Sequence, residues 1–512
     1  MVWLRGSSGG PERGWWTQVG LHVRRTVPRV LLLLAGSAVL PGMAHLVTGR
    51  RRTAAAIGGT TFVLLVTLLV YLRRTSRTEL LRAVVRPGWL AWLATAALLV
   101  AAAWIAVVVS SYLVLRPIRT NTAGQVAVSG MLTLLCVLVA LPPLVVARYA
   151  FVQRSLINDV FPDSGSLGEG GSGGRAGDPW QGRSRINVLL VASDAGPDRY
   201  GVRTDSLVLT SIDVHTGNVV MFSLPRNLQR VPLPAGPLRD TWPDGFPDLL
   251  NGVYQHVTEH PRLLAGARDR GAEAVKQVVG GILGLHVDYY AMANLQGFQE
   301  FVDALGGVTL TVQQRLPIGG ITANGTYVPP VGYIEPGRHR LNGYGALWYA
   351  RSRRDSNDYD RISRQRCLIG AMVRQADPLT VLKNFQRLAS ATKRLLSTDI
   401  PQQLLPSLVE LADKVRQNGQ IRSLPFVPPL INTADPNFAV IRADVQNALA
   451  AASAPTATPT SAGPRSATPR PAAPTPTARA GSADGGTGSS TGRPSTGRGS
   501  PAQVVDDVCN LG

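Results

Sequence analysis

Two aspartates lie where predicted strands end and begin, and their placement suits a divalent metal. Residues 185–193 (RINVLLVAS) form a continuous apolar run, typical of a strand buried on both faces, and Asp194 follows it directly. Asp205 opens the next predicted strand, at 205–213. Two carboxylates at neighbouring strand ends make a hard-oxygen site for Mg²⁺ or Mn²⁺, although aspartates that only cap loops give the same pattern.

Arginines supply the second kind of chemistry. Arg203 lies just before Asp205, and Arg226 follows a third predicted strand, which Pro225 ends so that the arginine is presented at the sheet edge. A denser group occupies 351–366. Its members are Arg351 and Arg353, two apart in extended chain, and Arg361 and Arg364, three apart on one face of a predicted helix.

So many guanidinium groups repel one another unless an anion or carboxylates neutralise them. Their planar forks match phosphate oxygens, which makes a pyrophosphate a natural ligand, and solvated surface arginines are the alternative interpretation. Two acids for a metal and an arginine clamp together indicate phosphoryl transfer. The sequence has no Gly-rich nucleotide loop and no kinase signature, so we expect a donor that comes from the bilayer and not a nucleotide.

A membrane anchor precedes these motifs. The apolar runs are 28–48, 54–72, 88–115 and 125–150. Each is long enough to cross about 30 Å of hydrocarbon at ~1.5 Å per residue. Pro41 interrupts the first run, which is therefore the candidate for a re-entrant segment. We expect a multi-pass plasma-membrane protein with three to four spans, and an extracytoplasmic catalytic domain then requires either an odd number of crossings or an external N-terminus.

The net charge of +20 raises the question of nucleic-acid binding. The basic residues are almost all arginine, since lysine occurs only at Lys276, Lys383, Lys393 and Lys414. Many arginines flank the apolar runs or lie near the C-terminus, and no basic helix with interleaved aromatics, zinc spacing or RNP-like strand is present. We therefore expect no nucleic-acid partner and a lipid bilayer instead.

Composition divides the chain into five parts. They are a cytoplasmic or re-entrant N-terminus (1–27), a transmembrane anchor (28–152), a flexible linker (153–184), a catalytic domain (185–450) and a disordered tail rich in Pro, Thr, Ser and Gly (451–512). Strands that alternate with helices in the fourth part predict a layered α/β domain with a mixed sheet. Cys367 and Cys509 could pair outside the cell, and two independent thiols are equally compatible with the sequence.

The middle of the chain resembles the LytR-CpsA-Psr family of cell-wall glycopolymer transferases. The resemblance runs from about 186 to 375 and rests on six stretches in order: NVLLVASDAG, VRTDSLVLTSID, FSLPRN, FVDALGGVTLTV, LNGYGALWYARSR and DYDRISRQR. Each stretch alone is weak, whereas the ordered set is specific. The family implies a three-layer α/β/α fold with an apolar pocket for a polyprenyl chain, lined from 280–350, and a pyrophosphate site at its mouth.

The resemblance also implies roles for residues at matching positions. Asp194 and Asp205 resemble the metal ligands. The pyrophosphate would be bound by Arg203, Arg226, Arg351, Arg353, Arg361, Arg364 and Gln365, and catalysis would involve Arg203, Arg351, Arg353 and Asp360. In the implied reaction a hydroxyl of peptidoglycan attacks the sugar-proximal phosphate of a polyprenyl-pyrophosphate-linked glycopolymer and releases polyprenyl phosphate. The Arg-, Pro- and Ala-rich composition suggests an actinobacterial source and an arabinogalactan-like donor.

The sequence departs from the family pattern at two places. Asn227 stands where an aspartate is usual, and 249–251 (LLN) replaces a Lys-Ile-Asn stretch. The multi-span anchor is also larger than the single span common in the family. Two other functions stay open at this point: hydrolysis of a polyprenyl pyrophosphate, with water as acceptor, and a non-catalytic membrane-anchored regulator or wall-binding module.

Overall fold

The computed structural model divides the chain into two compact units, of which unit 1 contains Met1–Gly173, Pro378–Arg394 and Asp399–Glu410, and unit 2 contains Gly174–Asp377, Leu395–Thr398 and Leu411–Gly512. The structure describes residues 26–115, 121–162, 178–194, 202–264, 266–321, 326–352, 357–376, 380, 396–453 and 502–509.

Unit 1 is helical, and three of its helices are long and apolar enough to cross a membrane: α3 (Arg51–Arg74), α5 (Pro87–Leu115) and α6 (Thr122–Val160). The shorter helices are α1 (Val27–Val39), α2 (Met43–Val47) and α4 (Arg77–Val84), with a 3-10 turn at Gln402–Leu404. The first apolar run is broken between α1 and α2, where Pro41 cannot continue a helix and Gly42 adopts a left-handed φ of 97°. The lower limit of the expected three to four spans is therefore the number of long apolar helices in the described residues.

The linker expected at 153–184 begins later than the sequence predicts. Helix α6 continues to Val160, because Leu156, Ile157 and Val160 recur at helical spacing and are buried. Gln153 donates from its amide to the carbonyl oxygen of Val84 at 2.8 Å, which fixes this last part of α6 to the end of α4. The prediction of a flexible linker is wrong for 153–160, and its central part, 163–177, lies outside the described residues.

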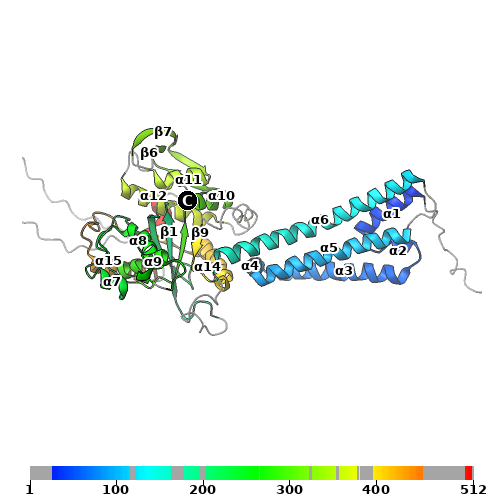
Figure 1. Cartoon of the computed structure of the whole chain (residues 1–512), viewed down its shortest axis with the longest axis horizontal. Coiled ribbons are helices and arrows are strands. Elements are labelled where there is room, and N and C mark those ends of the chain that lie inside the picture. The colour runs from blue at the N-terminus through cyan, green and yellow to red at the C-terminus, as the bar shows by residue number, and fades with distance from the viewer. Residues whose placement is uncertain are drawn as a thin grey trace, which may run out of the picture. The chain divides into compact units, whose positions relative to one another are not determined.

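A seven-stranded mixed sheet forms the centre of unit 2 (Figure 1). Its order is β11-β10-β3-β2-β1-β4-β9, with bounds β1 Arg185–Ser193, β2 Thr204–Asp213, β3 Val219–Leu224, β4 Tyr289–Ala293, β9 Leu396–Thr398, β10 Ile421–Pro425 and β11 Gln503–Val504. Strands β1, β2 and β3 form an antiparallel meander, whereas β4 joins β1 and β10 joins β3 in parallel. Both parallel neighbours are reached through helical crossovers, as parallel pairing requires.

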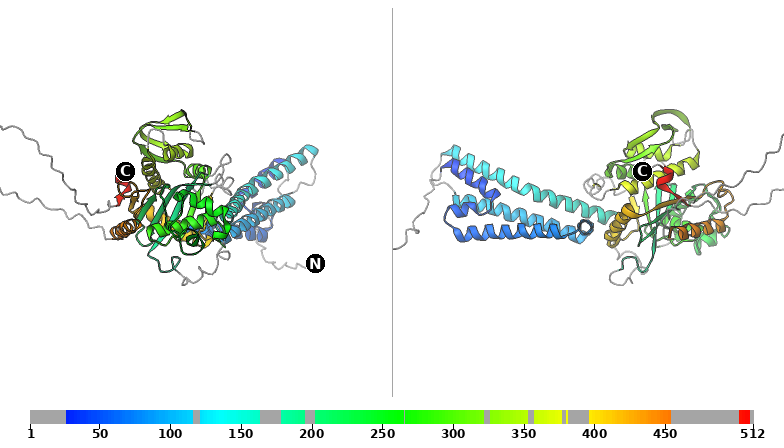
Figure 2. Two further views of the ribbon diagram at one scale, coloured as in Figure 1. Left: turned by 60° about the vertical axis from the view of Figure 1, so that its left-hand side comes forward. Right: turned by 180° about the vertical axis from the view of Figure 1, so that it is seen from behind.

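Helices cover both faces of this sheet (Figure 2). One face packs on α8 (Val253–Glu259), α9 (Arg270–Leu283) and α15 (Phe438–Ser453) through a core that includes Leu189, Leu209 and Phe222. The other face packs on α12 (Asp358–Gln375), α16 (Val505–Cys509) and the last part of α14 (Leu405–Asn418). Short elements complete the first layer: α7 (Pro237–Thr241) and the 3-10 turns Leu250–Gly252 and Pro261–Leu264. The predicted three-layer α/β/α fold with a mixed sheet is thereby confirmed.

A second apolar cluster lies beside the sheet. It is built from α10 (Leu295–Ala304), β5 (Val308–Val312), β8 (Gly337–Leu341), α11 (Gly343–Arg351) and the hairpin of β6 (Leu316–Ile321) and β7 (Tyr327–Ile334), and α12 closes it. Strands β5 and β8 pair with each other, as do β6 and β7, and neither pair joins the large sheet. In Figures 1 and 2 the β6–β7 hairpin projects from the rest of unit 2.

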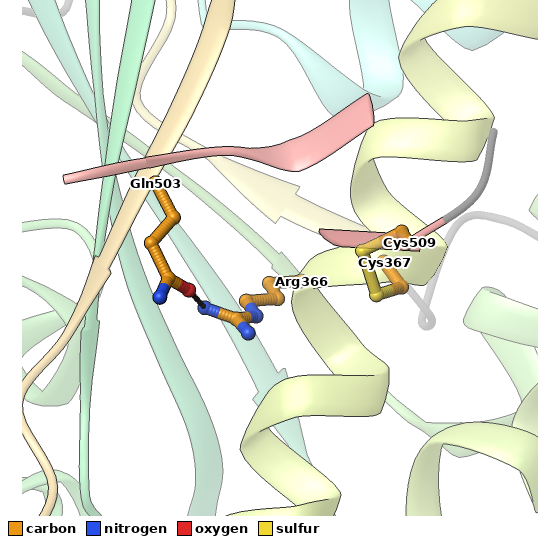
Figure 3. The surroundings of a disulfide bond; sticks show 4 residues. All are labelled: Arg366, Cys367, Gln503 and Cys509. Carbon is orange, nitrogen blue, oxygen red and sulfur yellow. Dashed lines mark hydrogen bonds between the residues drawn. A yellow bond between two sulfur atoms is a disulfide. The ribbon is translucent and has the colours of Figure 1, made fainter. Parts of the chain in front are cut away.

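The C-terminal residues correct the expectation of a disordered tail over 451–512. Helix α15 extends to Ser453, and residues 502–509 form β11, which pairs with β10, and α16, which packs on α12. Cys509 is joined to Cys367 of α12 by a disulfide (Figure 3), so the pairing that the sequence left open is present. A strand of two residues and a helix of five gain their stability from such tertiary contacts, which composition does not reveal. Residues 454–501 lie outside the described part.

Candidate functional site

The predicted metal-binding acids lie at one end of the sheet, where β1 ends and β2 begins. The backbone N–H of Asp194 donates to the carbonyl oxygen of Arg203 at 3.0 Å, and the N–H of Arg203 donates back to Oδ1 of Asp194 at 2.9 Å. This reciprocal pair closes the ends of the two strands and fixes the Asp194 carboxylate there. Asp205 follows at the second residue of β2, so both acids lie at the same sheet end, as predicted.

Arg226 is held at this same end of the sheet. Its Nη1 donates to Oδ1 of Asp205 at 2.7 Å, and both side chains are about three-quarters buried. The backbone after β3 is fixed by the segment that departs from the family pattern. The N–H of Asn251 donates to the carbonyl oxygen of Arg226, and the N–H of Leu250 donates to that of Leu228. The Leu-Leu-Asn stretch therefore has a structural role: it holds the loop that carries Arg226.

The second arginine group is divided between α11 and α12. Arg351 is the last residue of α11, and its guanidinium carbon lies 5.0 Å from the centre of the Trp348 ring. Arg364 of α12 donates from Nε to the carbonyl oxygen of Tyr349 at 2.9 Å and from Nη2 to that of Ser352. These hydrogen bonds satisfy carbonyl oxygens at the end of α11, where a helix has no partners of its own for them. Arg364 therefore fixes the end of α11, which carries Arg351.

Three other predicted residues lie in the first turns of α12. Asp360 accepts a hydrogen bond from the N–H of Asn357, as one half of a capping box, and is exposed. Arg361 is buried, 2% exposed, one residue further along α12. Gln365 accepts from the hydroxyl of Ser206 at 3.0 Å. Arg353 lies outside the described residues, so its predicted role is untested.

The Ser206–Gln365 contact brings α12 to the same end of the sheet as the Asp205–Arg226 pair. Asp205 and Ser206 are consecutive in β2, and consecutive strand side chains leave opposite faces. Asp205 shares its face with Leu207 in the core under α9, whereas Ser206 meets α12. Asp194, Asp205, Arg226 and Gln365 thus lie around one sheet end, an arrangement that sequence spacing alone did not predict.

Burial perturbs two arginines of α12. Burial lowers the pKa of Arg364 from its ordinary value, while neighbouring Tyr349 and Asp360 oppose the shift. Burial also lowers the pKa of Arg366, which is 7% exposed and donates from Nη1 to the amide oxygen of Gln503 at 3.3 Å (Figure 3). Guanidinium groups stay protonated even so, and buried cations of this kind favour an anionic ligand.

Sequence reasoning placed Arg366 in the basic cluster without a role, and it missed Ser206 and Ser352. Ser352 donates from its hydroxyl to the carbonyl oxygen of Pro317 at 2.9 Å and is buried, so it joins the end of α11 to the start of β6. Ser206 directly follows Asp205 in a quoted family stretch, which was the available signal. The contact partner of Ser352 is 35 residues away in the sequence, and that of Ser206 is 159 residues away.

Two carboxylates, those of Asp194 and Asp205, are the donors that this sheet end offers to a divalent metal. In the part of the chain that the structure describes, no three His, Cys, Asp or Glu side chains gather as a metal-binding group. Mg²⁺ is commonly held by one or two carboxylates while substrate phosphates and water supply its other ligands. Asp194 and Asp205 lie at one sheet end beside arginines and fit a site of this kind, with two carboxylates and phosphate oxygens as ligands.

The fold and this sheet end define a class of α/β/α domains that carry acids and arginines at the end of a central sheet. Residues 171–434 match the LytR_cpsA_psr family, and the chain belongs to this family. The resemblance read from the six sequence stretches is therefore confirmed.

Curated relatives carry both regulatory and wall-assembly names. The chain is 28% identical to Biofilm regulatory protein A of Streptococcus mutans (45% of this chain, 54% of that protein), 27% to Cell wall biosynthesis protein LcpA of Corynebacterium glutamicum (64% and 65%) and 25% to the polyisoprenyl-teichoic acid–peptidoglycan teichoic acid transferase TagU of Oceanobacillus iheyensis (46% and 65%). The chain thus spans about half to two thirds of the length of these relatives.

Solved structures with a similar fold include protein gbs0355 of Streptococcus agalactiae and TagV of Bacillus subtilis. The first is 28% identical in sequence and has a TM-score of 0.38; the match covers 47% of this chain and 77% of the solved chain. The second is 21% identical, covers 52% and 96%, and has a TM-score of 0.37.

Proposed function

We propose that the protein is a membrane-anchored phosphotransferase that moves a glycopolymer phosphate from a polyprenyl-pyrophosphate donor to a hydroxyl of peptidoglycan. The observation that carries the proposal is the Asp205–Arg226 pair at a sheet end that also receives Arg351, Arg364 and Gln365. Family membership and the name of the transferase TagU among the relatives support it. A glycopolymer of the arabinogalactan kind is the proposed donor.

In this mechanism the arginines bind the donor's pyrophosphate. Arg203, Arg226, Arg351 and Arg353 neutralise its charge, and Arg364 holds the end of α11 so that Arg351 keeps its position. The oxygen of the peptidoglycan hydroxyl forms a bond to the sugar-proximal phosphorus as the bridging P–O bond breaks. The bridging oxygen leaves on polyprenyl phosphate, and the hydroxyl proton passes to a base.

A divalent cation held by Asp194 and Asp205 would supply positive charge to the phosphate oxygens. Both carboxylates are already oriented, Asp194 by the N–H of Arg203 and Asp205 by Arg226. Asp360, in the first turn of α12, is the proposed base, since its side chain is exposed and lies one turn before Arg364. Each of these assignments is open to substitution.

We also propose that unit 2 is extracytoplasmic. A disulfide between Cys367 and Cys509 is expected in an oxidising compartment. Three crossings by α3, α5 and α6 would place the two ends of the anchor on opposite sides, with the N-terminus in the cytoplasm. The odd number of long apolar helices in the described residues supports this orientation, and peptidoglycan is accessible from that side.

The experiment uses the full chain in nanodiscs with Mg²⁺, a synthetic polyprenyl-pyrophosphate oligosaccharide and a peptidoglycan fragment. Mass spectrometry would detect a phosphodiester-linked product. We expect Arg226→Lys to lower the rate by about 100-fold, as expected for removing a preorganised bidentate contact to a charge that develops in the transition state. Arg230→Lys is the matched control, because Arg230 lies four residues away in an exposed pair with Asp435 and should retain the rate.

Each outcome of this assay has a distinct meaning. A linked product that Arg226→Lys loses and Arg230→Lys retains supports transfer at the proposed site. Release of polyprenyl phosphate without a linked product would favour hydrolysis, with water as acceptor. No turnover of any donor, with donor still bound, would favour a regulator or wall-binding module, as some relatives are named.

A further inference from the structure

The β6–β7 hairpin exposes apolar side chains that the site does not use. In the described part of unit 2, four large apolar side chains are exposed: Val331, Tyr333, Tyr344 and Val440. Val331 and Tyr333 of β7 are both exposed, and Val331 is 80% exposed, the highest fraction of the four; the strand register shifts beside Val331, between Ile318 and Gly319 of β6. Pro329 is also exposed. We call Pro329, Val331 and Tyr333 the outer face of the hairpin.

The opposite face of the hairpin is packed. Leu316 and Ile334 are buried in the cluster formed with α10, α11 and α12. The hydroxyl of Ser352 fixes the start of β6 through the carbonyl oxygen of Pro317. The outer face is therefore presented by a hairpin whose base is held rigidly, and its exposure does not follow from poor packing of the base.

We propose that this outer face contacts the headgroup region of the membrane that carries the anchor. Neither strand contains a charged residue, whereas Arg315, Glu335 and Arg338 flank them. The guanidinium carbon of Arg315 lies 3.7 Å above the Tyr333 ring, and its Nε contacts Glu335 at 3.0 Å, so Arg338 leaves a net positive charge at the base. Tyrosine beside arginine is typical of membrane interfaces, where anionic headgroups complement basic side chains.

The hairpin's backbone favours lipid over a second protein chain. An open two-stranded sheet can recruit a further strand through its unpaired N–H and C=O groups. Here Pro317, Pro329 and Pro330 lie within the strands and remove N–H donors, which disfavours such strand addition. The same open edges exclude deep insertion, because unpaired backbone groups are costly in hydrocarbon. A shallow contact at the interface satisfies both conditions.

This contact would give the proposed reaction a route for its lipid donor. Ser352, which fixes the hairpin, directly follows Arg351, so the outer face and the arginine clamp are joined through one short connection. A hairpin at the headgroup region would hold the apolar cluster beneath it near the polyprenyl chain. The membrane contact itself rests on the proposed anchorage, and it does not depend on the transfer reaction.

The test places a fluorescent dye on the full chain in vesicles of phosphatidylcholine and phosphatidylglycerol that contain doxyl-labelled lipid. Val331→Cys is labelled in a Cys136→Ser background, since Cys367 and Cys509 are paired and do not react. Val440→Cys is the matched control, an exposed valine on α15, 43% exposed. The unsubstituted chain labelled at Cys136, within α6, reports whether the anchor is in the bilayer.

We expect the dye at 331 to lose most of its emission to doxyl lipid and the dye at 440 to keep it. Equal emission at 331 and 440 with strong quenching at Cys136 would overturn the membrane contact while leaving the anchorage intact. Absence of quenching at Cys136 would remove the anchorage and the contact together. A change in the emission of the dye at 331 that depends on protein concentration in the absence of lipid would overturn the proposal. It would indicate that the outer face contacts a second copy of the chain.

Discussion

Reduction of the Cys367–Cys509 disulfide is expected to destabilise unit 2 substantially. The bond closes a loop with a sequence separation of 142 residues. Loop-closure entropy for that length is about −17 cal/mol/K, or about 5 kcal/mol at 25 °C, contributed mainly through the unfolded chain. The Arg374–Asp506 ion pair is partly exposed and contributes at most about 1 kcal/mol, so it cannot replace the covalent bond.

Pulse proteolysis of the detergent-solubilised chain across a urea series would measure this loss. With a urea dependence of about 2.5 kcal/mol per molar, the midpoint for unit 2 should fall by roughly 2 M in Cys509→Ser. Dithiothreitol should lower the midpoint of the unsubstituted chain similarly, because reduction removes the bond without changing a residue. Asp506→Asn is the control, and its midpoint should change by less than about 0.5 M. A midpoint that neither reduction nor Cys509→Ser moves would refute the reasoning.

Three further predictions concern unit 2. Gly343→Ala should lower the free energy of unfolding by about 3 kcal/mol in the same proteolysis assay, because a Cβ there would lie 2.0 Å from the carbonyl oxygen of Gln299; an unchanged midpoint would contradict the close approach of α10 and α11. His256 has a pKa below its ordinary value because of burial and then the neighbouring His260, so the unfolded chain takes up the proton first and stability falls as pH drops below about 6.5. His256→Gln should flatten the urea midpoint between pH 5 and 7.5, and equal slopes in both chains would exclude this cause. Ser206→Ala should cost about 1 kcal/mol by breaking the bond to Gln365, whereas a neutral result would show that this contact does not hold α12.

The strands that the sequence predicted best are those whose local composition is apolar enough to indicate burial. Strands β1 and β3 arise from nearly unbroken apolar runs, and a strand buried on both faces needs no further signal. The β6–β7 hairpin has the opposite character. Its strands contain three glycines and three prolines, residue types depleted in strands, so local propensity argued against it.

The candidate site was predictable as a set of residues but not as an arrangement. Sequence motifs identified Asp194, Asp205 and Arg226, because each follows or opens a strand and matches a family stretch. The contact of Ser206 with Gln365 joins residues 159 apart, and the disulfide between α12 and α16 joins residues 142 apart. Such contacts depend on tertiary packing, which spacing along the chain does not encode.

In the proposed mechanism, the Asp205–Arg226 pair gives a physical reason for the metal and the donor to bind together. Each side chain neutralises the other at 2.7 Å, so neither a cation nor an anion alone gains its full attraction to this site. A pyrophosphate that arrives with a divalent cation would exchange one neutral pair for two, Arg226 with phosphate and Asp205 with the cation. Separating a pair that is about three-quarters buried is costly, and the new charge-assisted contacts of both side chains would have to offset that loss. The N–H of Asn251 holds the backbone of Arg226, so in this proposal the exchange of partners is made by the two side chains.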